Sequence, residues 1–374
     1  MTGPLSSLKV LDFSTLLPGP YGTMMLADMG AEVVCVEAVS PKGLGFDKRF
    51  IPMRQYLGRS KRSLALDLKK TESQKVIKRL IDYYDIIVEQ FRPGVMDKLG
   101  LGYESLKKLN PKIIYCSLTG YGQTGPFKNR AGHDINYLAT SGVSSYSGTK
   151  KEGPVLSGTQ IADIGGGSLH TIVGLLAAVI HREKTGEGQK VDISMTDASF
   201  AFNSIHAANY FVAGMEPTLE STLLNGGSFY GYYETSDKRY FSVGSLEPKF
   251  FASMCEALGI SPQSDSLEIE KAFKKKTYSE WCEIFSKIDD CVEPVLSFKE
   301  AVDHPQIKER EMVVDVPFGE AFQKQVGNPL KFSSSKTKYK HVGGSPGKNT
   351  QEILLEVGLK QEEIDSLKKE GVVQ

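Results

Sequence analysis

Short apolar segments alternate with helical patterns through the first third of the chain, and this alternation restricts the fold more than any other feature. Residues 22–29 and the amphipathic segment 72–83 have helical spacing. Strand-like runs occur at residues 8–13, 32–36, 63–68, 86–89 and 113–118. Strand-helix-strand units connect parallel strands through right-handed crossovers. The pattern therefore predicts an α/β fold with an open, mainly parallel, Rossmann-like sheet.

The first strand does not lead into a dinucleotide-binding turn. It continues into Ser-Thr-Leu-Leu-Pro-Gly-Pro-Tyr at residues 14–21. This segment lacks the glycine spacing that lets a backbone approach a pyrophosphate. The sequence therefore argues against a nucleotide-dependent dehydrogenase.

The later part of the chain changes character near Asn225-Gly226-Gly227. Before it, we expect a helix at residues 169–180, a strand at 191–194 and one long helix at 195–212. After it, two short strands flank a turn at 236–239 and open a smaller α+β domain. Its helices continue to about residue 287 and place Trp281 in a core. A last helix is expected at 350–370, and the pattern does not decide whether it is docked or partly solvated.

Composition indicates a cytoplasmic globular protein. Of the 374 residues 40% are hydrophobic, and 45 basic residues balance 45 acidic ones. This balance gives no support for nucleic acid or a membrane surface as a partner. The five cysteines show no paired spacing, and we expect free thiols in a reducing compartment. No targeting segment is recognisable at the N-terminus, and no apolar run approaches the length of a membrane span.

Two motifs carry residues suited to acid/base chemistry. His133 lies in Ala-Gly-His-Asp-Ile-Asn-Tyr, and Asp163 lies in Ala-Asp-Ile-Gly-Gly-Gly-Ser. We expect Gly165, Gly166 and Gly167 to form a loop that feeds a helix N-terminus, where free backbone N–H groups make an oxyanion site. An imidazole and a carboxylate beside such a site can remove and return a proton. The alternatives are a hydrogen-bonded core pair and a simple tight turn.

Several further motifs extend this interpretation over nearly the whole chain. They include Phe91-Arg-Pro-Gly-Val, Ser117-Leu-Thr-Gly-Tyr-Gly-Gln-Thr-Gly-Pro, Gly132-His-Asp-Ile-Asn-Tyr and Thr185-Gly-Glu-Gly-Gln-Lys-Val-Asp. Together with Asp163-Ile-Gly-Gly-Gly-Ser, they resemble the class III CoA-transferase superfamily of the CaiB/BaiF type. Within that superfamily the chain is most similar to the α-methylacyl-CoA racemase branch.

The resemblance implies an interlocked homodimer in which each chain threads through its partner. It implies a large CoA-binding domain at residues 1–190 and 325–374 and a small domain at 225–315, joined by segments 191–224 and 316–324. His133 and Asp163 would be the two acid/base residues, and Glu247 would reach the site from the other subunit. In the transferases, the aspartate that matches Asp163 is instead a nucleophile that forms an acyl anhydride.

Positive charge locates the expected CoA phosphates. Arginine and lysine match phosphate in charge and geometry, and a solvated surface face is the alternative for any single residue. The expected CoA-binding residues are Arg54, Arg59, Lys61, Arg62, Arg92, Tyr121, Gly122 and Asp134. Related sequences usually carry a basic residue where this chain has Ala38, so one contact is missing or supplied elsewhere.

The chemistry favours a racemase that needs no metal or cofactor besides CoA in its substrate. Inversion at the α-carbon of a 2-methylacyl-CoA needs one base on each face of the enolate, and an imidazole with a carboxylate meets this need. A CoA transferase that uses Asp163 as nucleophile is the second hypothesis, and a non-catalytic acyl-CoA-binding dimer is the third. The acyl chain is not predictable from the sequence.

Overall fold

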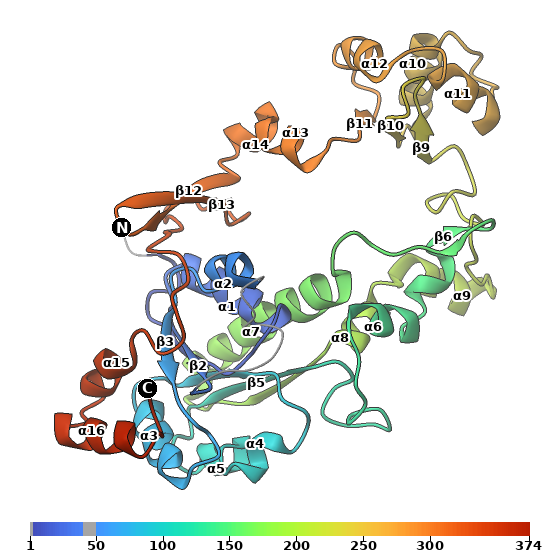
Figure 1. Ribbon diagram of the computed structural model, residues 1–374. Coiled ribbons are helices and arrows are strands. Elements are labelled where there is room, and N and C mark those ends of the chain that lie inside the picture. The colour runs from blue at the N-terminus through green and yellow to red at the C-terminus, as the bar shows by residue number, and fades with distance from the viewer. Residues whose placement is uncertain (1–2, 40–49) are drawn as a thin grey trace. The chain divides into compact units, whose positions relative to one another are not determined.

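Six strands form one sheet in the order β3-β2-β1-β4-β5-β8 in a computed structural model that describes residues 3–39 and 50–374 (Figure 1). Their bounds are Lys9–Asp12 (β1), Glu32–Glu37 (β2), Arg62–Ala65 (β3), Ile86–Glu89 (β4), Ile114–Thr119 (β5) and Lys190–Ser194 (β8). All neighbouring pairs are parallel, which confirms the predicted sheet. The strand order reverses between β1 and β4, and open α/β sheets bind ligands beside such a reversal.

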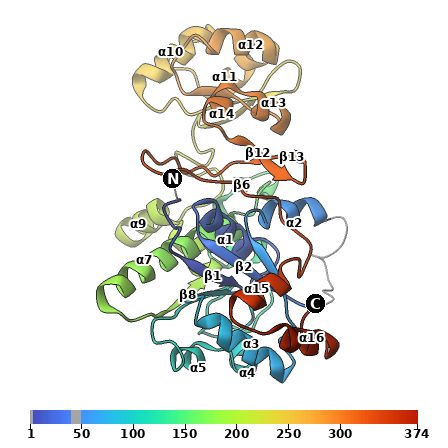
Figure 2. The same ribbon diagram turned by 90° about the vertical axis from the view of Figure 1, so that its left-hand side faces the viewer.

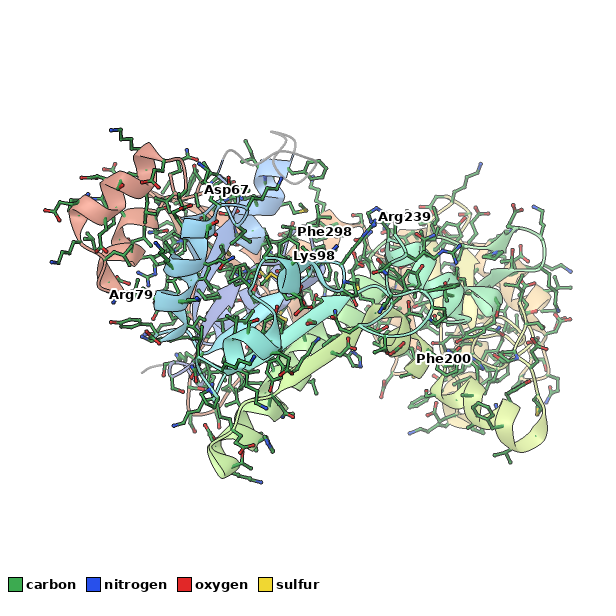
Figure 3. All side chains as sticks on the ribbon, turned by 90° about the horizontal axis from the view of Figure 1, so that it is seen from below. Asp67, Arg79, Lys98, Phe200, Arg239 and Phe298 are labelled. Carbon is green, nitrogen blue, oxygen red and sulfur yellow. The ribbon has the colours of Figure 1, made fainter. Side chains whose placement is uncertain are left out.

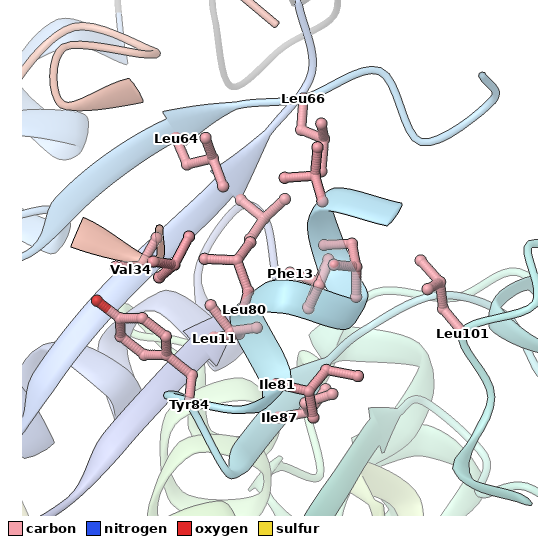
Figure 4. Close-up of a cluster of buried hydrophobic side chains, with 14 of the residues drawn as sticks. Leu11, Phe13, Val34, Leu64, Leu66, Leu80, Ile81, Tyr84, Ile87 and Leu101 are labelled. Atoms are coloured by element: carbon pink, nitrogen blue, oxygen red, sulfur yellow. The ribbon is translucent and has the colours of Figure 1, made fainter. Parts of the chain in front are cut away.

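Helices cover both faces of this sheet, and alternate strand residues therefore enter different cores. Val10 faces a cluster with α1 (Pro18–Asp28) and α7 (His170–Thr185), whereas Leu11 faces one with α3 (Thr71–Ile81). Figure 4 shows part of the second cluster, including Leu11, Leu64 and Leu80. The remaining helices of this region are α2 (Ile51–Leu57), α4 (Val95–Lys98), α5 (Tyr103–Lys107) and α6 (Asp134–Thr140).

The C-terminal segment docks on the same core as α3 (Figure 2). The single helix expected at 350–370 is wrong in one respect, because Gly358 has a φ of +83° and separates α15 (Thr350–Glu356) from α16 (Gln361–Lys369). That left-handed conformation is one that glycine adopts readily. Ile353 and Ile364 are fully buried, so both helices are docked instead of solvated.

The described residues divide into two compact units. The first comprises Met1–Ser141, Gly158–Phe202 and Glu311–Gln374, and the second comprises Gly142–Ser157 and Asn203–Arg310. Residues 316–324, expected to link domains, lie within an antiparallel hairpin of β12 (Val313–Phe318) and β13 (Ala321–Val326) in the first unit. The expected link 191–224 likewise contains most of β8, whose pairing with β5 makes it part of the sheet.

The second unit has its own aromatic core. Trp281 is buried there as predicted, and its indole N–H donates to the Phe273 carbonyl oxygen at 2.8 Å. The expected hairpin also forms, from β9 (Gly231–Glu234) and β10 (Tyr240–Val243). The other elements are η3 (Val143–Tyr146), β6 (Gly148–Thr149), β7 (Gly153–Pro154), α9 (Ser204–Ala213), α10 (Pro248–Leu258), α11 (Ser266–Phe273), α12 (Tyr278–Phe285), β11 (Val292–Pro294), α13 (Phe298–Asp303) and α14 (Pro305–Glu309).

The long helix expected at 195–212 is broken in two. The first helix, α8 (Met195–Ala201), ends two residues before α9 begins at Ser204. Between them, the buried side chain of Asn203 accepts a hydrogen bond from the Tyr146 hydroxyl at 2.7 Å. The Phe202 N–H is shared between two carbonyl oxygens, which tightens the last turn of α8. A polar side chain with a distant partner therefore overrides the helical periodicity.

One continuous helix, Ala162–Thr185, combines η4 (Ala162–Leu169) with α7. Its 24 residues are long and apolar enough to cross a membrane by length and composition, contrary to the expectation that no apolar run approaches that length. Buried core helices share this length and composition. The helix packs on β5 and β8, and Leu175 and Ala178 are buried.

Candidate active site

A pocket of about 450 Å³ opens at the carboxyl ends of β4 and β5. Its walls are residues 90–93 after β4, residues 119–121 at the end of β5, several residues between 128 and 137, and Met195. Ligands of open α/β sheets bind at the carboxyl ends of the strands. The fold therefore marks this pocket as the candidate site.

The pocket is positively charged. Arg92, Lys128 and Arg130 line it, and the lining residues include no aspartate or glutamate within the described parts of the chain. All three cations are exposed, and the Arg130 guanidinium lies 4.4 Å from the centre of the Phe127 ring. Such a wall suits a ligand that carries several phosphates. Lys128 and Arg130 are not among the CoA-binding residues expected from the sequence, although both lie within three residues of the Ala-Gly-His motif.

His133 lies on this wall, immediately before α6. Its backbone N–H donates to Asn136 Oδ1 at 3.0 Å, and the Asn136 N–H donates to the His133 carbonyl oxygen at 2.8 Å. Gly132 is required because a Cβ there would lie 2.6 Å from the Tyr137 ring. The Tyr137 hydroxyl also donates to the Gly132 carbonyl oxygen at 2.5 Å. These contacts fix the backbone that carries the imidazole.

Asp163 lies in the first turn of η4, which is a π-helical segment of eight residues. The expected loop before a helix is therefore wrong, because helical backbone begins at Ala162. Gly166 and Gly167 instead allow close packing, since a Cβ would lie 3.2 Å from the Met195 carbonyl oxygen or 3.0 Å from Pro18 Cβ, respectively. Gly165 is half-buried beside the Phe202 ring. The π-helix is a rare backbone form that often occurs at functional sites.

The structure brings Asp163 close to the segment that carries His133. The Asp163 N–H donates to Asp134 Oδ1 at 2.9 Å. Burial and the negative charge of Asp134 raise the pKa of Asp163 to about 6, while His133 acts in the opposite direction. A carboxyl group with such a pKa can both accept and donate a proton near neutral pH.

The raised pKa predicts how pH affects stability. The pKa of Asp163 is about 6 in the folded protein, compared with an ordinary value of 3.8. The folded protein therefore loses stability as pH rises from the ordinary pKa through about 6, because Asp163 must then ionise where it is buried. We expect Asp163→Asn to stabilise the protein by about 1–2 kcal/mol above pH 7, after allowance for solvent screening. The gain should disappear below pH 4. Urea unfolding at both pH values measures it, and an equal gain at both would contradict the assignment.

Two of the expected CoA-binding cations are structural. Arg59 is fully buried and forms an ion pair with Asp28 at 2.7 Å, and its other nitrogen donates to the Val326 carbonyl oxygen. Lys61 is also buried and donates to Asp12 at 3.3 Å and to the Pro20 carbonyl oxygen at 2.8 Å. A buried charge needs such partners. The prediction that these two side chains meet CoA phosphates is therefore corrected.

Arg54 and Arg62 are also engaged by carboxylates. Arg54 forms two hydrogen bonds with Glu37, at 2.6 and 2.7 Å. Arg62 pairs with Glu356 at 2.7 Å and with two further glutamates. Of the predicted cations, only Arg92 lines the pocket.

The other predicted residues are distributed as follows. Tyr121 lines the pocket and meets the Tyr137 ring edge-on, with 5.3 Å between ring centres. Gly122 is buried with a φ of +80° and supports the turn behind the pocket. The Asp134 carboxylate faces the Asp163 backbone. Glu247 is exposed in the second compact unit, immediately before α10.

Known proteins similar to this chain identify its family. The family model for CoA-transferase family III matches residues 5–350. The chain belongs to CoA-transferase family III. It is 38% identical to alpha-methylacyl-CoA racemase of Mus musculus, over 99% of this chain and 97% of that protein. It is 31% identical to succinyl-CoA:glutarate CoA-transferase of Homo sapiens, over 95% of this chain and 86% of that protein.

A solved structure supports the family assignment. A CAIB/BAIF family protein from Brucella suis superposes with a TM-score of 0.83 at 27% sequence identity, over 96% of this chain and all of that one. Family membership supports an enzyme, and it leaves both a racemase and a CoA transferase as candidates.

Proposed function

We propose that this protein is a 2-methylacyl-CoA racemase that uses His133 and Asp163 as its two bases. The observation that carries the proposal is that His133 lines the pocket and that the next residue, Asp134, accepts the Asp163 N–H at 2.9 Å, which brings together the segments of the two proposed bases. The Asp163 carboxyl group has a pKa of about 6. The relative named alpha-methylacyl-CoA racemase, which matches almost the whole chain, supports the same reaction.

The reaction is a balanced exchange of protons. One base removes the α-proton of the thioester, and the electron pair of the C–H bond moves into an enolate. The protonated second base then donates its proton to the opposite face of the same carbon, which inverts the centre. In one direction a neutral imidazole removes the α-proton and a protonated Asp163 supplies the new one. In the other direction an ionised Asp163 removes the proton and an imidazolium supplies it. Both states contain the same number of protons, and a carboxyl pKa of about 6 lies near the range in which imidazoles titrate.

Deuterium incorporation tests the proposal directly. Incubation of a single enantiomer of a 2-methylacyl-CoA in deuterated water, without an acceptor acid, should give α-deuteration and racemisation. A CoA transferase is the second candidate, favoured by relatives such as succinyl-CoA:glutarate CoA-transferase. Turnover that requires a carboxylic acid acceptor, with an acyl-Asp163 anhydride trapped by hydroxylamine, would replace the racemase by the transferase.

We also propose that the positive wall holds the nucleotide end of CoA, with Arg92, Lys128 and Arg130 in place of the buried Arg59 and Lys61. Arg92→Ala should raise KM for acyl-CoA about tenfold and change kcat little, because it removes binding shared by ground and transition states. The effect should shrink for a truncated pantetheine thioester, which lacks the nucleotide phosphates. An equal loss on both substrates would assign Arg92 to structural support.

A homodimer is the proposed assembly, with Glu247 of the partner subunit completing the site. Exposed apolar side chains support a partner: α9 has no buried residue, and Phe211 and Val212 are 75% and 88% exposed. Phe200 of α8, labelled in Figure 3, is 58% exposed. Such surface is usually covered in an assembly. A cytoplasmic location stays a prediction.

The assembly predicts that activity depends on protein concentration. Sedimentation should detect a dimer, and dilution below its dissociation constant should remove activity together with the dimer. A fully active monomer would exclude Glu247 from the site.

A further inference from the structure

We propose that Asp134 is a positioning residue that fixes the first turn of η4 and holds a negative charge beside Asp163. The inference rests on the proposed roles of Asp163 and His133. It differs from the expected contact of Asp134 with CoA, because the Asp134 carboxylate faces the Asp163 backbone.

The geometry is that of a helix cap supplied from another helix. The first N–H groups of a helix have no intrahelical partner. Ile161, at the cap position of η4, makes no side-chain hydrogen bond to this turn. Asp134, which is 29 residues earlier in the chain, accepts the Asp163 N–H at 2.9 Å instead. The helices α6 and η4 pack against each other, so the contact joins two elements of the same compact unit.

Asp134 also lies directly after His133 and begins α6. One side chain therefore ties the backbone of one proposed base to the segment that carries the other. A shift of η4 relative to α6 changes the separation of the two bases. Displacing a catalytic group by about 1 Å can lower the reaction rate roughly 10²-fold. Loss of this cap is therefore expected to lower the turnover rate.

The charge of Asp134 has a second effect. After burial, it is the larger electrostatic cause of the raised pKa of Asp163, and His133 lowers that pKa. Burial, followed by the negative charge of Asp163, raises the pKa of Tyr137 in α6 to about 12. The strand β8 and the helices α1, α7 and α8 also pack against η4. Their ionisable side chains are Tyr21 and Asp28 in α1, His170, His181, Arg182, Glu183 and Lys184 in α7, Lys190 and Asp192 in β8, and Asp197 in α8. His170 Nδ1 lies 2.9 Å from the Gly165 carbonyl oxygen. Burial, Asp134 and His133 account for the shift of Asp163.

The two effects of Asp134 are separable by substitution. Asparagine retains an oxygen that can accept the Asp163 N–H, but it carries no charge. Alanine removes both the acceptor and the charge. Asp134→Asn should therefore preserve the geometry and shift the titration of Asp163, whereas Asp134→Ala should also release the first turn of η4.

The experiment compares both variants with the wild type by two measurements. Asp134→Asn should keep kcat at its optimum within about threefold and move the Asp163-dependent limb of the pH–rate profile down by about one pH unit. NMR titration of the Asp163 carboxyl should show the same shift. Asp134→Ala should lower kcat at least tenfold, and the Asp163 amide should lose hydrogen-exchange protection, which Asp134→Asn retains.

A matched control is Asp265→Asn, which alters a carboxylate that accepts the Glu268 N–H at the start of α11. It should leave the Asp163 titration and the pH profile unchanged. Identical pH limbs in wild type and Asp134→Asn, or full amide protection in Asp134→Ala, would overturn the inference. Absence of α-proton exchange in the wild type would instead refute the proposed function, and the NMR titration and amide protection still test the contact itself.

Discussion

His133→Ala should reduce racemisation by about 10²–10⁴-fold in both directions, the range that general acid–base catalysis contributes. The variant should still exchange the α-proton of one enantiomer only, because Asp163 can remove and return a proton on its own face. Asp163→Asn should retain exchange of the opposite enantiomer, through His133. Enantiomer-specific deuterium incorporation, followed by NMR and chiral analysis, distinguishes these patterns.

The fold and the binding of acyl-CoA should persist in both variants. His133 is exposed on the pocket wall, so its truncation leaves no cavity in a core. His181→Ala, at an exposed histidine of α7, is the control and should behave like the wild type. Near-normal racemisation by His133→Ala would refute the two-base mechanism. If the protein instead transfers CoA, and Asp163→Asn loses that activity while His133→Ala keeps it, Asp163 would be assigned as the nucleophile of a CoA transferase.

Arg59→Ala should destabilise the protein by about 3–5 kcal/mol, because it leaves the Asp28 carboxylate buried without its cation. Both side chains are at most 1% exposed, and the guanidinium forms two hydrogen bonds with the carboxylate, at 2.9 and 2.7 Å. Asn328 also donates to the same carboxylate at 3.4 Å. Urea unfolding at fixed protein concentration measures the loss.

The Arg59→Ala protein that remains folded should have the same KM for acyl-CoA as the wild type, whereas Arg92→Ala should have a raised KM. Arg182→Ala is the matched control, since Arg182 pairs with Asp85 at 2.8 Å with Asp85 39% exposed. That partly solvated pair should be worth less than about 1 kcal/mol. The double variant Arg59→Met with Asp28→Leu should recover most of the lost stability, because apolar residues can replace a buried pair. A large KM effect of Arg59→Ala without a stability loss would restore the CoA-binding role.

Arg59 and Arg92 look alike in the sequence but have different environments in the fold. Both are arginines in short polar stretches near strands, and charge alone recommended both for phosphate binding. One is enclosed by an aspartate 31 residues earlier and by a backbone carbonyl more than 260 residues later. The other lies on the wall of the pocket. Local pattern does not encode this difference, because the partners that bury a charge are distant in the chain.

The oxyanion prediction failed for a related reason. Three consecutive glycines usually indicate a turn, yet residues 162–169 form a π-helical segment, against which α1 and α8 pack tightly. Gly166 and Gly167 supply the space for that packing. Tertiary contacts thus outweighed the low helix propensity of glycine.

The sequence by itself determined the parallel sheet, the buried Trp281 and the two motifs that carry His133 and Asp163. These features depend on short-range geometry: apolar runs of strand length are buried on both faces, and their order fixes the crossovers. Only the tertiary structure decided which cations line the pocket and where helices break. It also decided that Asp134 caps the turn of Asp163. Each of these outcomes depends on polar partners that folding brings together across many residues, and such partners leave no period in the sequence.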